Sequence, residues 1–488
     1  MNNKIIRLPF KKCKPYPHQE FAVKFAQEVG NIGLLWDMGA GKTRGMIDIM
    51  RMLGTKAGRM LRTLIITPPA TLNNWKEEIA MHSNFPIHAV LIVSGDKKHE
   101  VLVKALTFDS AILITNYETM INKDLKALIK EFRPEVMVLD EAHYIKTHNA
   151  KRTKEILELG LNVQHKYILT GTPITNNIDD IFTLMQFLDN GEALTTNYYA
   201  FKSLYMVDKN AWMKARAGMK HFPKYVPCPE MFGILTAKIA KRCLRVLKKD
   251  VMKDLPPRIE VVKEVGLAPV QKKIYEDMKR DFIAFVEDAQ NGNKYAVIAQ
   301  VAMVKALRLM QICSGHVKDD QEAIHEVPTG KPALLKELLE EIVIGGNNKC
   351  IIWHHFRHDV KIISKVCSDL GIKYVSMGGG MSVNERTQAM DAFNKGSAMV
   401  FIGQRQSAGI GINLVPANYS IGYSRDFSLS TELQSRDRNY RGGSQIHDHI
   451  TKIDLVTAGT IEVDVVKALQ NKEELGKKII DIIKGERR

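Results

Sequence analysis

The sequence has few of the features that mark secreted, membrane-spanning or metal-clustered proteins. Its six cysteines are widely scattered and form no Cys-x-x-Cys pair, which argues against a disulfide framework and against a zinc site. We therefore expect reduced thiols in the core. The segment Met1–Phe10 is too polar, and its apolar run too short, for a secretory signal. No transmembrane segment, internal repeat or low-complexity tract appears either, so the sequence predicts a globular, cytosolic protein.

Acidic residues are scarce relative to basic ones. Lys and Arg number 70 and Asp and Glu 54, which gives a formal net charge of +16 in a chain of 488 residues. This excess favours a polyanionic partner, nucleic acid first. An anionic membrane surface is the competing partner, disfavoured because no long apolar helix or polybasic amphipathic end stands out. The length allows two or three domains.

One glycine-rich stretch organises the chain. Trp36-Asp-Met-Gly-Ala-Gly-Lys-Thr-Arg44 lies between an apolar run, 31–35, and a helix-like segment, 45–53. A strand that turns through glycines into a helix presents backbone N–H groups and the positive end of a helix dipole to one point. Such a point suits a polyphosphate. The residues predicted to bind nucleotide are Met38, Gly39, Ala40, Gly41, Lys42 and Thr43.

The match to the phosphate-loop pattern is incomplete. The pattern has a glycine five residues before Gly41, where this chain has Trp36. Lys42 can still reach the terminal phosphates, and the Thr43 hydroxyl can hold Mg²⁺. The alternative interpretation is a glycine turn that only closes a strand-to-helix connection. Upstream, the Gln19 amide can pair with a donor and an acceptor on an adenine edge, although a glutamine at a helix start is commonly a polar cap.

Short apolar strands alternate with helix-length segments through the first part of the chain. This alternation predicts a parallel, doubly wound sheet with its functional loops at the carboxyl ends of the strands. The predicted strands lie at 63–67, 111–115, 136–139 and 167–169.

Two adjacent carboxylates follow the predicted strand 136–139, which we expect to lie beside the nucleotide loop. Asp140 is placed to bind Mg²⁺, directly or through water, and Glu141 to orient and deprotonate an attacking water. Neighbouring carboxylates at the end of a buried strand are costly unless a cation compensates them. An exposed acidic turn is the alternative.

The pattern changes twice along the chain. We assign 1–188 to an ATP-binding lobe, 189–330 to a helical, partly basic middle region and 331–488 to a second sheet lobe. Basic runs such as 241–249 can line a phosphate track, but a solvated helix face is favoured. The second lobe has predicted strands at 349–353, 373–376, 398–402, 419–423 and 450–456.

Two arginines stand out in the second lobe. Arg438 and Arg441 are three apart, so on a helix they share one face and can point together at a terminal phosphate, as arginine fingers do. A salt-bridged surface helix is the alternative. His354, His355 and His358 are close in sequence, yet no carboxylate or cysteine cluster stands beside them, so we do not assign a metal site.

Both halves together resemble the Swi/Snf-type branch of the superfamily two helicases. The resemblance rests on eight motifs in order, spread from residue 16 to 445 and thus over nearly the whole chain. They are Tyr16-Pro-His-Gln19, Asp37-Met-Gly-Ala-Gly-Lys-Thr43, Asn74-Trp75, Thr115-Asn-Tyr-Glu118, Asp140-Glu-Ala-His143, Leu169-Thr-Gly-Thr-Pro-Ile-Thr-Asn-Asn177, Gly409-Ile-Gly-Ile-Asn-Leu414 and Gln434-x-x-x-Arg438-x-x-Arg441.

The resemblance implies an ATP-driven, magnesium-dependent motor that moves on duplex or branched DNA with two RecA-like lobes. It also implies that 170–173 couples hydrolysis to lobe movement and that 74–75, 115–118 and 409–413 lie near DNA and the cleft between the lobes. The implied catalytic residues are Lys42, Asp140, Glu141, Arg438 and Arg441. Gln19, reading adenine, and Gln434 join the glycine-loop residues in binding nucleotide, and Thr43 and Asp140 are the implied magnesium ligands.

The chain departs from the family pattern in two places. Trp36-Asp37 replaces the usual Asp-Glu, and Arg441-Gly-Gly-Ser-Gln445 is one residue longer than the typical ending. Neither change removes a catalytic group. The compact chain resembles a phage or bacterial member acting as a monomer on forks and branched DNA, in the host cytosol if phage-encoded. The alternatives are a nucleotide-switched DNA clamp and an RNA-remodelling ATPase.

Overall fold

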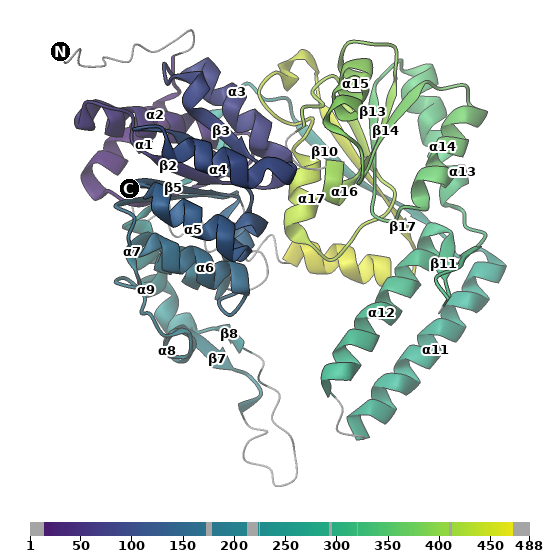
Figure 1. Cartoon of the computed structure of the whole chain (residues 1–488). Helices are drawn as coiled ribbons and strands as arrows, with labels where there is room; N and C mark the ends of the chain where they lie inside the picture. The colour runs from purple at the N-terminus through teal and green to yellow at the C-terminus, as the bar shows by residue number, and fades with distance from the viewer. Residues whose placement is uncertain are drawn as a thin grey trace. The chain divides into compact units, whose positions relative to one another are not determined.

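The computed structural model of the chain describes residues 14–171, 178–211, 223, 225–291, 295–319, 321–408 and 412–471. The chain divides into two compact units, one ending at Lys253 and the other spanning Asp254–Asn471. We call them lobe 1 and lobe 2. Each is built on one parallel sheet (Figure 1). The predicted fold class, two doubly wound parallel-sheet lobes, is confirmed.

Lobe 1 has a seven-stranded sheet in the order β3-β4-β2-β5-β6-β1-β9, and every neighbouring pair is parallel. The strands that flank the glycine loop's strand, β6 and β9, are therefore far from it in sequence. The strands are β1 (Ile32–Trp36), β2 (Thr63–Ile66), β3 (Val90–Val93), β4 (Ile112–Thr115), β5 (Val136–Asp140), β6 (His165–Leu169) and β9 (Cys243–Val246).

Helices cover both faces of this sheet, which explains why its strands are apolar on both sides. One core cluster joins the sheet to α1, α2 and α3, and the other joins it to α4, α5, α6 and α7. The helices are α1 (Pro17–Val29), α2 (Lys42–Ala57), α3 (Leu72–His82), α4 (Lys98–Leu106), α5 (Lys123–Phe132), α6 (Lys151–Gly160) and α7 (Asp180–Asp189).

Lobe 2 repeats this plan with a six-stranded sheet in the order β10-β17-β16-β13-β15-β14, again parallel throughout. Separate core clusters lie on its two faces. The strands are β10 (Arg258–Val265), β13 (Cys350–His354), β14 (Tyr374–Met377), β15 (Val400–Gln404), β16 (Tyr419–Gly422) and β17 (Ile450–Thr457). The helices are α13 (Lys331–Leu339), α14 (Asp359–Asp369), α15 (Val383–Asn394), α16 (Arg405–Ala408) and α17 (Leu429–Arg436).

The stretch 189–330, predicted as one helical region, contains strands as well and is divided between the lobes. It supplies β9 to the sheet of lobe 1 and β10 to the sheet of lobe 2. Both strands carry charged residues, so neither is an apolar run of the kind that predicts a buried strand. The remaining elements are α8 (Tyr198–Tyr205), β7 (Met206–Asp208), β8 (Tyr225–Pro227), α9 (Pro229–Ala240), α10 (Lys248–Val251), α11 (Pro269–Asn291), α12 (Tyr295–Ser314), β11 (His316–Lys318) and β12 (Ile324–Glu326).

Two long helices, α11 and α12, run alongside each other in lobe 2 (Figure 1). Residues 292–294, which connect the two helices in sequence, lie outside the described residues. No helix in the described part of the chain is long and apolar enough to cross a membrane. The five cysteines that the structure describes are free, and four of them, Cys243, Cys313, Cys350 and Cys367, are buried.

Candidate nucleotide-binding site

The glycine loop has a backbone that requires glycine at two positions. Strand β1 ends at Trp36, and α2 begins at Lys42 with Gly41 as its N-cap. Gly39 and Gly41 have φ angles of 77° and 80°, in the left-handed region where a side chain is strained. A Cβ on Gly41 would also lie 2.4 Å from Nε2 of Gln19. The loop therefore keeps the backbone that the sequence predicted.

Trp36, which stands where the phosphate-loop pattern has glycine, belongs to the core. Its side chain is buried and packs against α2, where a Cβ on Gly45 would lie 2.9 Å from the indole ring. Only its backbone takes part in the loop, and its carbonyl oxygen accepts a hydrogen bond from Lys42 Nζ at 3.0 Å. A large residue fits here because a glycine on the neighbouring helix makes the room.

Helix α1 holds two consecutive loop carbonyls. His18 Nε2 hydrogen-bonds Ala40 O at 2.9 Å, and Gln19 Nε2 donates to Gly41 O at 3.1 Å. Because the peptide bond is trans, a carbonyl held toward α1 turns the following N–H to the opposite side. Gln19 Oε1 also accepts the backbone N–H of Tyr16, so Gln19 caps its helix and braces the loop. Its role in reading adenine stays a prediction.

Lys42 lies over its own loop. Its ammonium donates to the carbonyl oxygens of Trp36 and Asp37, at 3.0 and 3.3 Å. Withdrawal from water lowers the pKa of Lys42, and the negative charges of Glu141 and Asp140 partly oppose that shift. The lysine is thus close enough to both predicted catalytic carboxylates to feel their charge.

Asp140 is the last residue of β5, and one strand, β6, separates β5 from the loop's strand β1. The side chain is 8% exposed, and its Oδ2 accepts hydrogen bonds from Thr67 Oγ1 at 2.9 Å and Trp75 Nε1 at 2.8 Å. Its Oδ1 accepts the Glu141 backbone N–H at 3.0 Å. Burial, reinforced by the Glu141 charge, raises the pKa of Asp140, while the Trp75 and Thr67 hydrogen bonds oppose that rise.

Glu141 has a strained backbone. Its φ of 51° and ψ of 51° place a non-glycine residue in the left-handed region, which costs about 1–3 kcal/mol and is concentrated at functional sites. One of its carboxylate oxygens lies 3.4 Å from Nδ1 of His143. This left-handed conformation turns the chain sharply after Asp140, so the carboxylates of Asp140 and Glu141 can face the same ligand.

The donor set fits Mg²⁺. The described residues contain no group of three or more His, Cys, Asp or Glu side chains that could hold a metal ion. Mg²⁺ does not need such a group, because it keeps several waters and is bound through one or two carboxylates together with substrate phosphates. The buried carboxylate of Asp140 and the hydroxyl of Thr43 at the start of α2 are oxygen ligands of this kind.

Two segments that the family resemblance placed near DNA and the cleft, 74–75 and 115–118, contact Asp140. Trp75 lies in α3 and is 1% exposed, with its N–H on Asp140. Tyr117 is buried and donates its hydroxyl to the Asp140 carbonyl oxygen at 2.7 Å. The Asn116 side chain accepts the Thr119 backbone N–H and starts a short helical turn. Trp75 and Tyr117 are distant from Asp140 in the sequence, so their contacts with it could not be predicted from local patterns.

The predicted coupling segment is described only at its start. Thr170 is buried, and its N–H donates to Leu34 O at 3.2 Å, so it lies beside β1. A Cβ on Gly171 would lie 3.1 Å from the Met38 side chain, which places Gly171 against the glycine loop. Residues 172–177 and 409–411 lie outside the described part of the chain.

In the basic run 241–249, Arg245 and Lys248 contact the glycine loop, so at these two positions the run is not a solvated helix face. Arg245 lies in strand β9, and its guanidinium pairs with the Asp37 carboxylate at 2.5 Å. The backbone N–H of Lys248 donates to the other Asp37 oxygen at 2.9 Å. These contacts tie β9 and α10 to the glycine loop, and their partner is the aspartate at a position where the family pattern has glutamate.

Arg438 and Arg441 do not lie on a helix, and this part of the prediction is wrong. Helix α17 ends at Arg436. The two side chains still converge, because Arg438 Nη1 and Arg441 Nη1 both donate to Ile412 O, at 3.5 and 3.1 Å. Arg438 Nε also donates to the Gln434 carbonyl oxygen at 2.9 Å. A turn after α17 thus achieves the pairing that helical spacing was expected to produce.

The three histidines at the end of β13 and just after it make ordinary structural contacts. His354 is buried and its Nδ1 hydrogen-bonds Phe356 O at 2.9 Å, and burial lowers its pKa to about 4. The backbone N–H of His355 donates to Ser424 Oγ at 2.7 Å. His358 Nε2 lies 3.8 Å from a carboxylate oxygen of Glu326.

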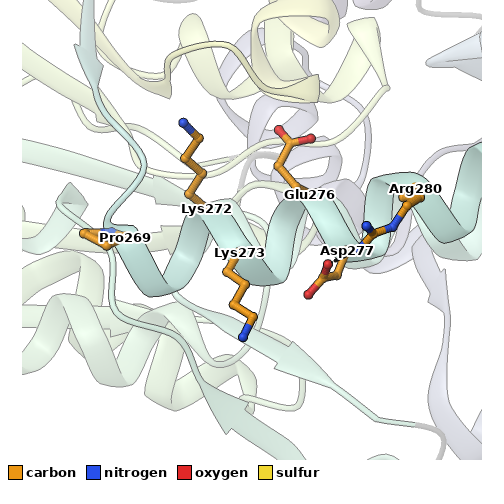
Figure 2. A pocket seen from close by; sticks show the side chains of 6 residues that line it. All are labelled: Pro269, Lys272, Lys273, Glu276, Asp277 and Arg280. Carbon is orange, nitrogen blue, oxygen red and sulfur yellow. Dashed lines mark hydrogen bonds and ion pairs between the residues drawn. The ribbon is translucent and has the colours of Figure 1, made fainter.

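A hollow of about 460 Å³ lies along α11 in lobe 2. Figure 2 shows that all of its lining side chains come from this one helix and point in different directions. They are Pro269, Lys272, Lys273, Glu276, Asp277 and Arg280. Charged residues spread around a single helix do not converge on a ligand, so this hollow is not a candidate site.

Two known family models match the chain, one after the other along the sequence. Residues 18–317 match the family model described as the SNF2-related domain, and residues 330–443 match the helicase conserved C-terminal domain. The chain is 27% identical to the CHD3-type chromatin-remodeling factor PICKLE of Arabidopsis thaliana, over 92% of this chain and 32% of that protein. It is 24% identical to the DNA repair and recombination protein RAD54B of Homo sapiens, over 96% of this chain and 55% of that protein.

These curated relatives are longer proteins, of which the chain spans about a third to just over half. Among solved structures, the Sulfolobus solfataricus SWI2/SNF2 ATPase core in complex with dsDNA is similar. It shares 27% sequence identity and a TM-score of 0.43 over 96% of this chain and 93% of that one.

Proposed function

The chain belongs to the SNF2-related family, and from this premise we propose that it hydrolyses ATP to move along DNA. The observation that carries the proposal is the grouping of Lys42, Asp140 and Glu141. A glycine loop at a helix start, a lysine beside it and two adjacent carboxylates at the end of another buried strand of the same sheet are the parts that phosphoryl transfer requires.

Each residue of the group has a distinct part in the proposed reaction. The loop N–H groups and Lys42 bind the phosphates, and Lys42 exchanges its two loop carbonyls for phosphate oxygens when nucleotide enters. Thr43 and Asp140 hold Mg²⁺, which supplies charge neutralisation on the phosphates when it is bound. Glu141 orients the attacking water and accepts its proton.

The remaining charge stabilisation is assigned to lobe 2. We propose that Arg438 and Arg441 act as arginine fingers on the transferring phosphoryl group. Their convergence on one carbonyl oxygen supports the pairing, because two guanidiniums that share an acceptor can be transferred together to a phosphate. Gln19 and Gln434 complete the proposed nucleotide contacts.

DNA is the proposed track. The net charge of +16 favours a polyanion, and the relatives include proteins named a DNA repair and recombination protein and an ATP-dependent DNA helicase. Duplex or branched DNA, with fork or junction remodelling by a monomer, is the specific form that we propose. A nucleotide-switched clamp and an RNA-remodelling ATPase are the competing functions.

The deciding experiment measures ATP hydrolysis and strand displacement by the purified chain on linear, forked and four-way DNA and on duplex RNA. DNA-stimulated turnover with displacement of a triplex strand is expected, and Glu141→Gln should lose turnover by about 10²–10⁴-fold. Glu100→Gln makes the same chemical change at an exposed position in α4 and should behave as the wild type. DNA-stimulated hydrolysis without strand displacement would favour the clamp, and stimulation by RNA alone would favour RNA remodelling.

A further inference from the structure

The two carboxylate oxygens of Asp140 have different surroundings. Oδ2 accepts two side-chain hydrogen bonds, from Trp75 Nε1 at 2.8 Å and Thr67 Oγ1 at 2.9 Å. In the described part of the chain, Oδ1 accepts one, from the Glu141 backbone N–H at 3.0 Å. Because an sp² oxygen has two lone pairs, the protein occupies the in-plane capacity of Oδ2 and leaves capacity on Oδ1.

The two donors come from fixed positions. Trp75 is 1% exposed in α3, and its ring packs in the core of lobe 1. Thr67 is fully buried after β2, where its N–H donates to Thr115 O at 2.9 Å and its hydroxyl also meets that of Thr71 at 2.5 Å. Donors locked in this way set the rotation of the carboxylate and do not follow it.

We propose that Trp75 and Thr67 are positioning residues that dedicate Oδ2 of Asp140 to the protein, so that Oδ1 is the oxygen that binds Mg²⁺, directly or through a water. This inference rests on the proposed ATPase function and adds two residues that the sequence did not assign to the metal. A ligating carboxylate held by fixed hydrogen bonds is already oriented for the ion, and loss of such outer partners commonly weakens metal affinity about 10–100-fold.

Trp75→Phe is the decisive variant, since it removes the N–H donor while keeping an aromatic ring in the core. Its matched control is Trp353→Phe in β13, a buried tryptophan whose N–H has no hydrogen-bond partner among the described residues. Both variants lose an indole N–H and a similar volume, but only one loses a bond to Asp140. Thr67→Val, which removes the second donor to the same oxygen, is an independent test.

The measurement is the affinity of the full chain for a fluorescent ADP analogue with and without Mg²⁺. The ratio of the two affinities reports the metal's contribution without any turnover. Trp75→Phe and Thr67→Val are each expected to reduce this ratio by about 10–100-fold, with metal-free affinity unchanged. Trp353→Phe is expected to keep the wild-type ratio.

The outcomes separate this inference from the function on which it rests. If Mg²⁺ raises the nucleotide affinity of the wild type, Trp75→Phe and Thr67→Val equally, the positioning role is wrong. The ATPase proposal is unaffected by that outcome. A wild-type chain that binds no nucleotide overturns both. Loss of metal-free binding in Trp75→Phe, with Thr67→Val keeping the wild-type ratio, would show that Trp75 serves only the fold.

Discussion

The carboxyl edges of the two sheets have the same architecture and opposite charge chemistry. In lobe 1, this edge carries the glycine loop and two adjacent carboxylates, and the pKa of Asp140 is raised because burial and Glu141 both disfavour its charge. Lys42, the cation that feels both carboxylates, hydrogen-bonds to carbonyl oxygens of its own loop. In the described part of the chain, the Asp140 carboxylate accepts hydrogen bonds from uncharged N–H and O–H groups only.

In lobe 2, buried charges neutralise one another. Glu432, 6% exposed, accepts hydrogen bonds from Arg405 at 2.7 Å and Lys452 at 2.6 Å, and its pKa is held well below the usual value by these cations despite burial. Lys452 also pairs with Asp454 at 2.8 Å, and Arg425 lies 3.2 Å from the same aspartate. The network joins α16, α17 and β17 with Arg425, which follows β16, and each of its carboxylates has a cationic partner within the lobe.

The difference teaches how to separate catalytic from structural charge in similar folds. Charges that satisfy one another inside a lobe bind its elements together, and removing one leaves its partner buried and unpaired. A buried charge that no protein group of opposite sign compensates marks a candidate site for a metal ion or a ligand. The expected effects below test this contrast, from the largest to the smallest.

Arg438→Ala should impair the reaction most while leaving the fold intact. Arginine fingers contribute about 10³–10⁵ to the rate of phosphoryl transfer, so turnover should fall by this order while nucleotide binding persists. Steady-state ATPase assays and binding of a fluorescent ADP analogue measure the two effects. Arg280→Ala, which removes an exposed arginine side chain of α11, is the matched control and should behave as the wild type. Loss of binding together with turnover would contradict the finger role.

Glu432→Ala should impair stability where Arg438→Ala impairs rate. Removing the shared acceptor leaves Arg405 and Lys452 buried, which costs about 3–5 kcal/mol of the free energy of unfolding of lobe 2. Thiol labelling along a urea gradient reads the lobes separately, since Cys243 is buried in lobe 1 and Cys313, Cys350 and Cys367 are buried in lobe 2.

For this experiment the control is Glu340→Ala, which removes an exposed glutamate in lobe 2. Its labelling midpoints should match those of the wild type. In Glu432→Ala only the three buried thiols of lobe 2 should become reactive at lower urea. An equal shift of Cys243, or no shift, would contradict a network confined to lobe 2.

Gly41→Ala should weaken nucleotide binding. The residue has a φ of 80°, and its new Cβ would lie 2.4 Å from Gln19 Nε2, so the loop must shift at a cost of about 1–3 kcal/mol. Affinity for ADP should fall about tenfold or more. Gly58→Ala carries similar strain, with a φ of 68°, at the other end of α2 in open space. It should lower stability and leave affinity unchanged.

The smallest effect is a pH dependence of lobe 2. Burial lowers the pKa of His354 and His316 to about 4, below the ordinary value of 6.5. Their contribution to stability is therefore complete above pH 6.5 and is lost as the pH falls from 6.5 toward 4. Asp359 acts in the opposite sense, because burial raises its pKa to about 7, and its contribution is lost as the pH rises from 3.8 through 7.

His354→Asn isolates the histidine contribution, since the amide can replace Nδ1–H on Phe356 O without titrating. Calorimetry between pH 7.5 and 4.5 should show a shallower decline of the lobe 2 transition in this variant. That transition is identified as the one that Glu432→Ala lowers. An unchanged decline would show that other groups control the acid stability of lobe 2.

Much of the fold could be predicted from the sequence because parallel strands buried on both faces are apolar throughout. Most strands of both lobes were found in this way, and the helix that follows the glycine loop was found from its spacing. Three strands of the two large sheets were missed. Arg245 and the charged residues of β10 break the apolar pattern in β9 and β10, whereas β3 is apolar and was missed all the same. The charge of Arg245 is neutralised by Asp37, more than 200 residues away, and no local pattern records that partner.

The sequence by itself determined the chemistry available to the site, namely the glycine loop with Lys42 and the carboxylates Asp140 and Glu141. Residue type and local spacing carry this information, because phosphate and metal binding require particular atoms at particular short intervals. Only the tertiary structure decided that Trp75 and Thr67 hold one oxygen of Asp140, and that a turn brings Arg438 and Arg441 to one carbonyl. Hydrogen bonds between elements distant in the chain depend on packing, which local spacing does not encode.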